Sequence, residues 1–406
     1  MNMKVGLPDS VIAAVRSQEK VVGSPHELYR YPARFSPKFV REVIESFTKP
    51  GDLVLDPFCG GGTTVVEAMA LGRRAVGMDI NSLAIFLART KTTPISVHDK
   101  AAILEWLEAR CAEDELTKLH RPRASPGLDI GHYHRNIPAE AKIFFEWLLD
   151  RLFLLSKSPQ RAFVRLVLLS VGQRALDCKD RLPCFAEMKG LFATELTKAL
   201  DNFVGFLTET AKANTLPRCR LKSRRRVINR STAGSEEDGR IPRSWLPAKL
   251  VLTSPPYPGV HVLYHRWQVL GRKETPVPFW LANQRDGAGE SHYTLGSRTE
   301  PKLKAYFQRL ESMFRSVRGL VDRGSLVIQL VAFSDPVWQL PAYLKAMEDA
   351  GFIEVDVELD KKAGSARRIW RQVPSRKWYA ENKGAISASK EVLLVHRPRT
   401  DSGRTN

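Results

Sequence analysis

The feature that most constrains the fold of this chain is a strand–loop–helix–strand pattern near its N-terminal end. An apolar run at 53–55 ends at Asp56, glycines stand at 60–62, a helical pattern covers 63–72, and a second strand-like run covers 75–79. Two strands joined by a helix become parallel neighbours through a right-handed crossover. The pattern therefore predicts an α/β fold whose ligand-binding residues gather at the carboxyl edge of the sheet.

A separate strand-like run, 250–252, lies about 170 residues further along the chain. It directly precedes a second motif, Thr253, Ser254, Pro255, Pro256 and Tyr257. The two prolines fix two φ angles and remove two N–H donors, which leaves the Ser254 side chain and nearby carbonyls as a rigid set of acceptors. The Tyr257 ring offers a surface on which a planar base can stack, an interaction worth about 1–3 kcal/mol. This motif predicts a site for a flat ring that carries an amine.

The segment between the two motifs has a different pattern. Apolar residues recur at helical spacing through 99–118, 139–156, 160–177 and 188–213, with no convincing strand. Strand-like runs return at 249–253, 324–331, 352–358 and 391–396. We interpret the chain as one α/β domain interrupted by a helical insertion: residues 1–96 and 247–398 form the two parts of the domain, 97–246 the insertion and 399–406 a tail.

The composition indicates the kind of partner and excludes several classes of protein. Lys and Arg total 63 against 44 Asp and Glu, a formal net charge of +19, which favours a polyanionic partner, although a basic protein that is merely soluble has the same charge. Five cysteines without a close pair argue against a disulfide framework and a zinc site, so we expect no metal. No run has the length and apolarity of a signal peptide or a membrane span, and we expect a cytoplasmic protein with no membrane partner.

The glycine loop is similar to a nucleotide-binding turn, but Val65 stands where the dinucleotide fingerprint needs its third glycine. Asp56 would also place a negative charge where a pyrophosphate lies. A cofactor with cations and no phosphate resolves this conflict, and S-adenosylmethionine carries a sulfonium and an ammonium group. We therefore expect Asp56 to face these cations, Gly60 and Gly62 to let the backbone approach the cofactor, and Phe58 to pack against it.

Asp79 ends the second strand of the pattern, two residues before Asn81. An acid at this place suits hydrogen bonds to ribose hydroxyls, and Asn81 is expected near the adenine. For Asp79 alone, an equally good interpretation is the N-cap of the helix that begins near Ser82. After a glycine loop, ribose binding is the interpretation we prefer.

Together these segments resemble the amino-group DNA methyltransferases, which methylate exocyclic amines of cytosine or adenine. Residues 56–64 are similar to that family's cofactor loop, 78–81 to its ribose-binding strand end, and 31–37 to an accessory element at the methionine end of the cofactor; the alternative for 31–37 is a loop that packs its aromatic rings in the core. The resemblance implies a Rossmann-like methyltransferase fold, a mostly parallel seven-stranded sheet with helices on both faces. The expected cofactor-binding residues are Tyr31, Pro32, Arg34, Phe35, Asp56, Phe58, Gly60, Gly62, Thr63, Asp79 and Asn81, and the expected catalytic residues are Ser254, Pro255, Pro256 and Tyr257.

In this family Ser-Pro-Pro-Tyr is most typical of cytosine-N4 enzymes, and Asp-Pro-Pro-Tyr of adenine-N6 enzymes. The resemblance therefore implies methylation of cytosine N4 in DNA, on a base flipped from the duplex or taken from a single strand. An amine needs alignment more than a strong base, which suits Ser254. Three alternatives stay open: an adenine-N6 DNA methyltransferase, an RNA guanine-N2 methyltransferase, and a DNA-binding protein of this fold without catalysis.

The insertion lies where some family members carry a target-recognition region. The basic run 218–230 is expected to contact phosphates, with a solvated loop as the alternative, and segment 258–300 to be a lid that orders on DNA, with a small static core as the alternative. The residues expected at DNA are Arg218, Arg220, Arg224, Arg225, Arg226 and Arg266. The recognition sequence, the strand preference, the oligomeric state and the existence of a cognate restriction endonuclease are left open.

Overall fold

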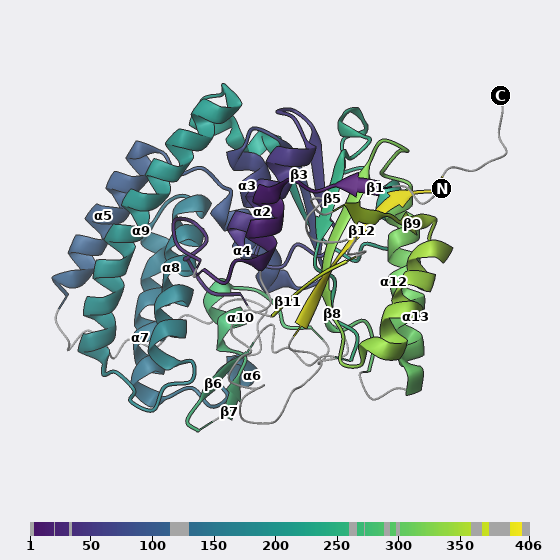
Figure 1. Cartoon of the computed structure of the whole chain (residues 1–406). Helices are drawn as coiled ribbons and strands as arrows, with labels where there is room; N and C mark the ends of the chain where they lie inside the picture. The colour runs from purple at the N-terminus through teal and green to yellow at the C-terminus, as the bar shows by residue number, and fades with distance from the viewer. Residues whose placement is uncertain are drawn as a thin grey trace.

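A mostly parallel sheet of eight strands lies at the centre of the described part of the chain, seen here in a computed structural model (Figure 1). The strands follow the order β11 (Ile369–Gln372), β12 (Lys390–Pro398), β8 (Leu326–Ala332), β5 (Leu250–Thr253), β2 (Leu53–Asp56), β3 (Arg74–Asp79) and β4 (Arg225–Asn229), and β9 (Phe352–Glu354) pairs with β12. Neighbours from β8 to β4 are parallel, whereas β12 is antiparallel to β8, β9 and β11. The expected Rossmann-like methyltransferase fold is confirmed, with β9 as one strand beyond the seven expected.

The structure describes residues 4–19, 21–31, 35–113, 130–259, 266–271, 273–287, 293–297, 301–358, 368–372 and 390–399. Pro32 and Arg34, which we expected at the cofactor, lie outside these ranges.

Helices cover both faces of the sheet. Every residue of β2, β5 and β8 is buried, as in parallel strands that are covered on both sides. Alternate residues of β2 enter different cores: Leu53 packs with α12 (Lys304–Arg318) and α13 (Pro336–Asp349), and Val54 packs with α1 (Asp9–Arg16) and α2 (Pro37–Phe47). The strand ends that carry the two sequence motifs therefore stand on a buried, rigid layer.

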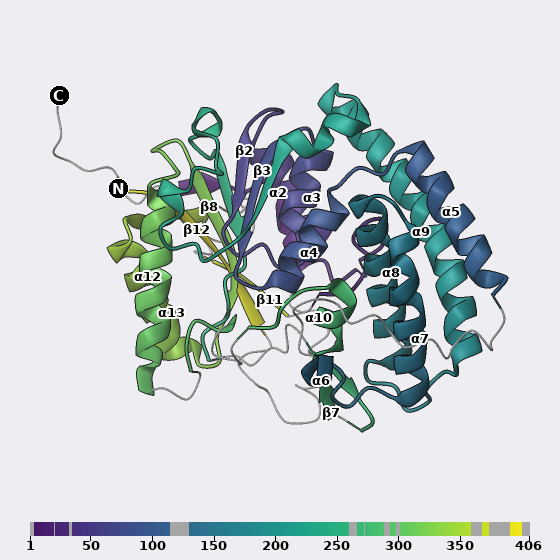
Figure 2. The same cartoon turned by 180° about the vertical axis from the view of Figure 1, so that it is seen from behind.

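Long helices form a second body beside the sheet (Figure 2). They are α5 (Val97–Cys111), α7 (Ala139–Arg151), α8 (Ser158–Leu176) and α9 (Phe185–Asn214), which confirm the four helices expected in the insertion. Their shared core contains Phe144, Phe163 and Phe203. α9 contacts α3 (Thr63–Ala70) and α8 contacts α4 (Ser82–Lys91), so this body rests on the helices that follow the glycine loop and β3.

One prediction about the insertion is wrong, because the segment 97–246 contains β4. This strand extends the central sheet by parallel pairing with β3, from Ala75 opposite Arg225 to Asp79 opposite Asn229. The sequence pattern did not predict this strand, because an edge strand needs few apolar residues and only Val227 and Ile228 are apolar here. The α/β domain therefore resumes before residue 247, and the insertion ends ahead of β4.

Smaller elements complete the described ranges. β1 (Lys4–Gly6) pairs with β10 (Asp356–Glu358), and the hairpin of β6 (Trp267–Val269) and β7 (Lys273–Thr275) leads to α10 (Val277–Ala282), which contacts the short α6 (Ile130–Tyr133). The strand-like run 352–358 is divided into β9 and β10. Among the helices of the described ranges, none has the length and apolarity that crossing a membrane requires.

Candidate active site

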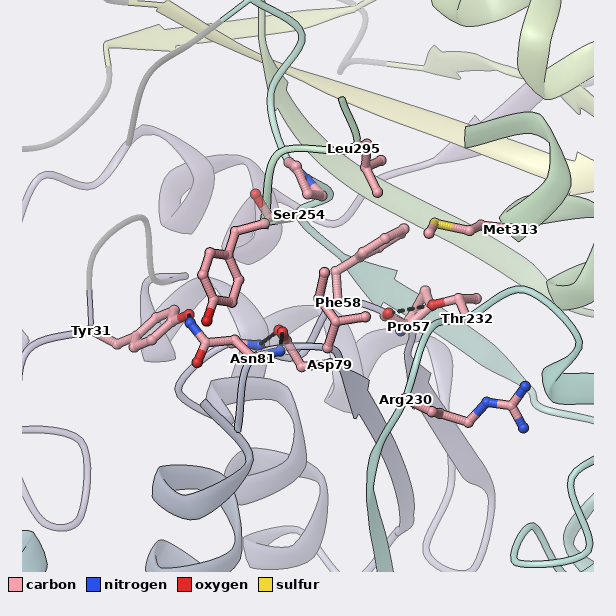
Figure 3. A pocket seen from close by; sticks show the side chains of 14 residues that line it. Tyr31, Pro57, Phe58, Asp79, Asn81, Arg230, Thr232, Ser254, Leu295 and Met313 are labelled. Carbon is pink, nitrogen blue, oxygen red and sulfur yellow. Dashed lines mark hydrogen bonds between the residues drawn. The ribbon is translucent and has the colours of Figure 1, made fainter. Parts of the chain in front are cut away.

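Two cavities lie at the carboxyl edge of the sheet, where β2, β3 and β5 end side by side. The larger holds about 650 Å³ of empty space and is lined by Asp79 (Figure 3), and the smaller holds about 300 Å³ and is lined by Asp56. The residues that line both are Tyr31, Phe58, Gly60 and Ser254. The cavities are therefore adjoining parts of one site, which brings both sequence motifs together.

Asp56 is a buried carboxylate in the smaller cavity, with 3% of its surface exposed. Its Oδ1 accepts a 2.7 Å hydrogen bond from the Thr253 hydroxyl and a 3.2 Å bond from the Phe58 N–H. Burial raises the pKa of Asp56 to about 6, and hydrogen bonds, not a cation of the described residues, oppose that rise. A cationic ligand in this cavity would supply the missing counter-charge.

Asp79 faces the larger cavity and organises the glycine loop. Its Oδ2 accepts a 2.9 Å hydrogen bond from the Gly60 N–H, and its Oδ1 accepts a 2.8 Å bond from the Asn81 N–H. Burial raises the pKa of Asp79 to about 6. Each carboxylate oxygen has a second lone pair, so the group can still accept bonds from ribose hydroxyls.

Asn81, not Asp79, is the N-cap of α4, so the alternative interpretation of Asp79 is wrong. The Asn81 Oδ1 accepts a 2.9 Å hydrogen bond from the Leu83 N–H, and its Nδ2 donates a 3.1 Å bond to the Tyr31 hydroxyl. Asn81 lines the larger cavity as expected, and its side chain also positions Tyr31 there.

The glycine loop is shaped to hold Tyr31. A Cβ added at Gly61 would lie 2.9 Å from the Tyr31 Cβ, and one added at Gly60 would lie 3.2 Å from the Tyr31 Cε1. Gly62, which we expected at the cofactor, lines neither cavity: its φ is +85°, and an added Cβ would lie 2.6 Å from the Ala88 Cβ. Gly62 therefore serves helix packing, and Gly61, which sequence reasoning missed, lines the smaller cavity. Phe35 and Thr63 line that cavity as expected.

Tyr257 does not offer its ring to either cavity, so the predicted stacking surface is wrong. The side chain is buried, with 6% exposed, in the core that contains Phe314 and Tyr343. Its hydroxyl accepts a 3.0 Å hydrogen bond from the Ser254 Oγ and donates a 2.6 Å bond to the Glu391 Oε1. Tyr257 therefore acts on the site through Ser254.

The two prolines of the motif differ in position. Pro256 lines the larger cavity, and its carbonyl accepts a 2.7 Å hydrogen bond from the Tyr306 hydroxyl. Pro255 lines neither cavity. Ser254 is therefore the side-chain acceptor that the motif presents to both cavities.

The basic run 218–230 is ordered, so its alternative as a solvated loop is wrong. Its first part is a 3-10 helix, Arg218–Arg224, that leads into β4. Because β4 is parallel to β3, Arg218, Arg220 and Arg224 precede the amino end of the sheet, opposite the cavities. The length of β4 alone separates the two edges by about 13 Å. The position of these arginines therefore gives no support to contacts with DNA at the site.

Two arginines of β4 have structural partners instead. Arg225 is buried, and its Nη2 donates to the Arg89 carbonyl at 3.1 Å and to the Thr93 hydroxyl at 2.9 Å. Burial lowers the pKa of Arg225 to about 10. The guanidinium carbon of Arg226 lies 4.7 Å from the centre of the Trp245 ring. The prediction that Arg225 contacts phosphate is wrong, because its guanidinium is inside the protein.

The segment after the second motif contains a buried aromatic core, as the alternative interpretation had it. Trp267 is 1% exposed and donates a 3.2 Å hydrogen bond to the Tyr29 hydroxyl, and Trp280 is also buried. Arg266, expected at DNA, donates a 3.2 Å hydrogen bond to Asp286 within the protein. The packing of these residues supports the static core, and the lid stays a prediction; residues 260–265, 272, 288–292 and 298–300 of the segment lie outside the described ranges.

Sequence reasoning missed several residues that line the larger cavity: Ile80, Arg230, Thr232, Tyr293, Leu295 and Met313. Thr232 donates a 2.6 Å hydrogen bond to the Pro57 carbonyl, and Arg230 pairs with Asp238. Recognising β4 would have placed Arg230 and Thr232 at the site, because they follow the carboxyl end of that strand. Leu295 and Met313 come from segments without a motif.

The residues present fit S-adenosylmethionine. The smaller cavity offers a buried carboxylate to its cations and a glycine loop that packs closely against Tyr31, with no room for a Cβ at Gly61. The larger cavity combines Asp79, suited to a ribose, with Phe58 and Met313 as apolar walls for a flat ring. The described residues contain no group of three or more His, Cys, Asp or Glu side chains placed to hold a metal ion.

Comparison with known proteins gives a family match over the same part of the chain. Residues 12–89, which include β2, the glycine loop and β3, match the family described as DNA methylase. The chain is 42% identical over 73 residues to the type II methyltransferase M.MvaI of Kocuria varians, a match that covers 17% of this chain and 16% of that protein.

Two further relatives are named for other activities. The chain is 39% identical over 72 residues to a tRNA (guanine(10)-N2)-dimethyltransferase of Methanothermobacter thermautotrophicus, covering 17% of this chain and 21% of that protein. It is 39% identical over 56 residues to the DNA adenine methyltransferase YhdJ of Escherichia coli, covering 14% and 19%. The matches thus span between 16% and 21% of these relatives' lengths. Over residues 12–89, which carry the glycine loop and the ends of β2 and β3, the chain is similar to the DNA methylase family.

Proposed function

We propose that this protein transfers a methyl group from S-adenosylmethionine to the exocyclic N4 amine of a cytosine in DNA. The observation that carries the proposal is the position of Ser254, which lines both cavities and borders the cofactor loop. An acceptor at this place faces the point where an amine would meet the cofactor's methyl group. The order β2, β5 in the sheet brings this residue beside Asp56.

In this proposal the carboxylates bind and orient the cofactor, which supplies an electrophilic methyl group on its sulfonium. Asp56 holds the cationic end through its buried charge, and Asp79 accepts hydrogen bonds from the ribose. Their low-dielectric surroundings strengthen both interactions relative to water. Phe58 lines both cavities and offers each of them an apolar ring surface.

Ser254 aligns the base. The N4 amine donates a hydrogen bond to the Ser254 Oγ, which directs the nitrogen lone pair toward the methyl group. The bound cofactor would supply the methyl group to this lone pair, with its thioether as the leaving group, and the methylated amine would then lose its proton to solvent. The serine need not act as a base, and alignment with electrostatic stabilisation carries the acceleration.

The choice of cytosine depends on Ser254, since an aspartate is more typical of adenine enzymes at this position. Adenine N6 in DNA is the second candidate, and the similarity to YhdJ supports it. DNA as the substrate is supported by the family match, by the similarity to M.MvaI and by the net charge of +19. We extend the proposal to a cytoplasmic enzyme that selects its target through the helical insertion and works beside a cognate restriction endonuclease.

Competition between nucleic acids tests the class of substrate. The purified protein is incubated with methyl-labelled S-adenosylmethionine and equal masses of unmethylated DNA and RNA, and the label in each is counted. We expect label in DNA, at least about tenfold less label with Ser254→Ala, and no change with the exposed helical control Gly190→Ala. Label confined to RNA contradicts the proposal.

A further inference from the structure

A line of hydrogen bonds runs from Ser254 away from the cavities. The Ser254 Oγ lies 3.0 Å from the Tyr257 hydroxyl, which lies 2.6 Å from the Glu391 Oε1. The other carboxylate oxygen, Oε2, accepts a 2.8 Å hydrogen bond from the Arg371 Nε and makes a 2.7 Å ion-pair contact with the Arg371 Nη2. The residue that faces the proposed amine is therefore connected to an ion pair on the far strands of the sheet.

This ion pair is rigidly placed. Glu391 and Arg371 stand opposite each other in the antiparallel register of β11 and β12, with 5% and 9% of their surfaces exposed. The Arg371 Nη1 also donates a 3.2 Å hydrogen bond to the Val15 carbonyl in α1. The two contacts with Arg371 and the pairing of the strands hold the Glu391 carboxylate in one orientation.

The chemistry of the end group sets the direction of every hydrogen in the line. The carboxylate paired with Arg371 can only accept, so the Tyr257 hydroxyl must donate to it. The Tyr257 oxygen then accepts the hydrogen of Ser254, as the 3.0 Å distance allows. With its one hydrogen directed away from the cavities, Ser254 keeps only lone pairs for a ligand.

We propose that Glu391 is a positioning residue that makes Ser254 an obligate acceptor toward the amine. Without the carboxylate, the Ser254 hydroxyl could turn its hydrogen toward an amine that is itself a donor, and the two donors would repel. This inference rests on the proposed function, because it assigns the acceptor that the reaction uses. Glu391 lines neither cavity and does not touch the substrate.

The substitution Glu391→Gln keeps the size of the side chain but reverses the direction of the hydrogen bonds in this line. Arg371 requires an acceptor, so the glutamine Oε1 faces Arg371 and its NH₂ group donates to Tyr257. The Tyr257 hydroxyl must then donate to Ser254, whose hydrogen turns toward the cavities. In single-turnover transfer to DNA we expect the methyl-transfer rate constant to fall about 10- to 100-fold, with the cofactor Kd within about twofold of the wild type.

A double substitution separates this role from a structural one. In a Ser254→Ala background no hydroxyl remains to be oriented, so adding Glu391→Gln should reduce the remaining rate less than about twofold. Glu354→Gln is the matched control. Glu354, on β9, also accepts two 2.6 Å hydrogen bonds from an arginine, Arg368, and β9 pairs with the same strand β12. We expect the single variant Glu354→Gln, in which Ser254 is intact, to transfer methyl groups at the wild-type rate.

The outcomes are distinct. Equal losses of rate from Glu391→Gln with and without the Ser254→Ala substitution, or a wild-type rate in the single variant, overturn the positioning role while the proposed function stands. A wild-type protein that labels no nucleic acid overturns the proposed function and this inference with it. If Glu391→Gln does not fold, Tyr257→Phe replaces it, because it removes the acceptor of the Ser254 hydrogen; its effect on the rate must likewise vanish in the Ser254→Ala background.

Discussion

The Thr253 hydroxyl donates a 2.7 Å hydrogen bond to the Asp56 Oδ1, and this bond joins the strand that carries the Ser-Pro-Pro-Tyr motif to the strand that carries the cofactor loop. The two residues end the neighbouring parallel strands β5 and β2. Because Thr253 directly precedes Ser254, a ligand bound by the charge of Asp56 would lie beside the strand end that carries Ser254. This hydrogen bond therefore connects the strand ends at the proposed cofactor and base subsites.

Cofactor binding is expected to release protons near pH 6. Burial holds the pKa of both Asp56 and Asp79 at about 6 in the ligand-free protein, so each is partly protonated at that pH. A cationic ligand favours the ionised carboxylates and expels those protons. Affinity should therefore fall as the pH is lowered through about 6 and level off near pH 7, as calorimetry in buffers of different ionisation enthalpy can measure.

Asp56→Asn is the matched variant for that measurement. It keeps the size of the side chain and removes the charge, so we expect the cofactor Kd to rise about 30-fold or more, since loss of one partner of a buried charge pair costs about 2 kcal/mol or more. Proton release at pH 6 should shrink by the share of Asp56. An unchanged Kd would contradict the assignment of the smaller cavity to the cationic end of the cofactor.

Gly61→Ala is expected to weaken cofactor binding by displacing Tyr31. The new methyl group would lie 2.9 Å from the Tyr31 Cβ, so the ring must move out of the place where it lines both cavities. We expect a several-fold increase in the cofactor Kd measured by calorimetry. In the control Gly190→Ala the added Cβ meets nothing within 4 Å, and stability should rise by up to about 1 kcal/mol from helix propensity. Equal affinities in the two variants would show that Tyr31 is not held by the loop.

Arg225→Ala is expected to destabilise the fold, while Arg220→Ala is not. Arg225 is buried and satisfies the Arg89 carbonyl and the Thr93 hydroxyl, whereas Arg220 is exposed. Removal of the buried donor should cost about 1–3 kcal/mol in the free energy of unfolding, which urea titration measures. Equal stabilities would mean that β4 does not depend on this guanidinium.

Substitution of Arg218 and Arg220 by alanine should leave the salt dependence of DNA binding unchanged. These residues precede the amino end of β4, at the edge of the sheet opposite the cavities. Removing one side chain that binds a phosphate reduces the slope of log K against log salt by about 0.9. A reduction of that size in the double variant would place DNA at this edge and contradict our interpretation of the basic run.

The sequence was most informative where one residue type has one physical use. The run from Leu53 to Asp79 predicted a strand, a glycine loop, a helix and a strand, and the structure has each of them within two residues. The separate strand at 250–253 joined the same edge because parallel strands put their carboxyl ends together. The cofactor residues Asp56, Phe58, Gly60 and Asp79 line the cavities for that reason.

The errors arose where tertiary contacts decide the role of a side chain. The sequence of the β4 arginines is typical of a solvated or DNA-facing run. Arg225 is nevertheless buried, and it donates hydrogen bonds to Arg89 and Thr93, which are distant in sequence. The sequence of the second motif predicted Tyr257 as a stacking ring, yet Glu391 on β12 holds its hydroxyl and makes it a structural partner of Ser254. Neither partner could be identified from local pattern.

The identity of the methylated base tests the central claim most directly. DNA is incubated with the protein and methyl-labelled S-adenosylmethionine, digested to nucleosides and separated, so that the label is assigned to one nucleoside. The account predicts label in N4-methyldeoxycytidine. Label in N6-methyldeoxyadenosine, or DNA that carries no label while the protein binds the cofactor, would contradict it.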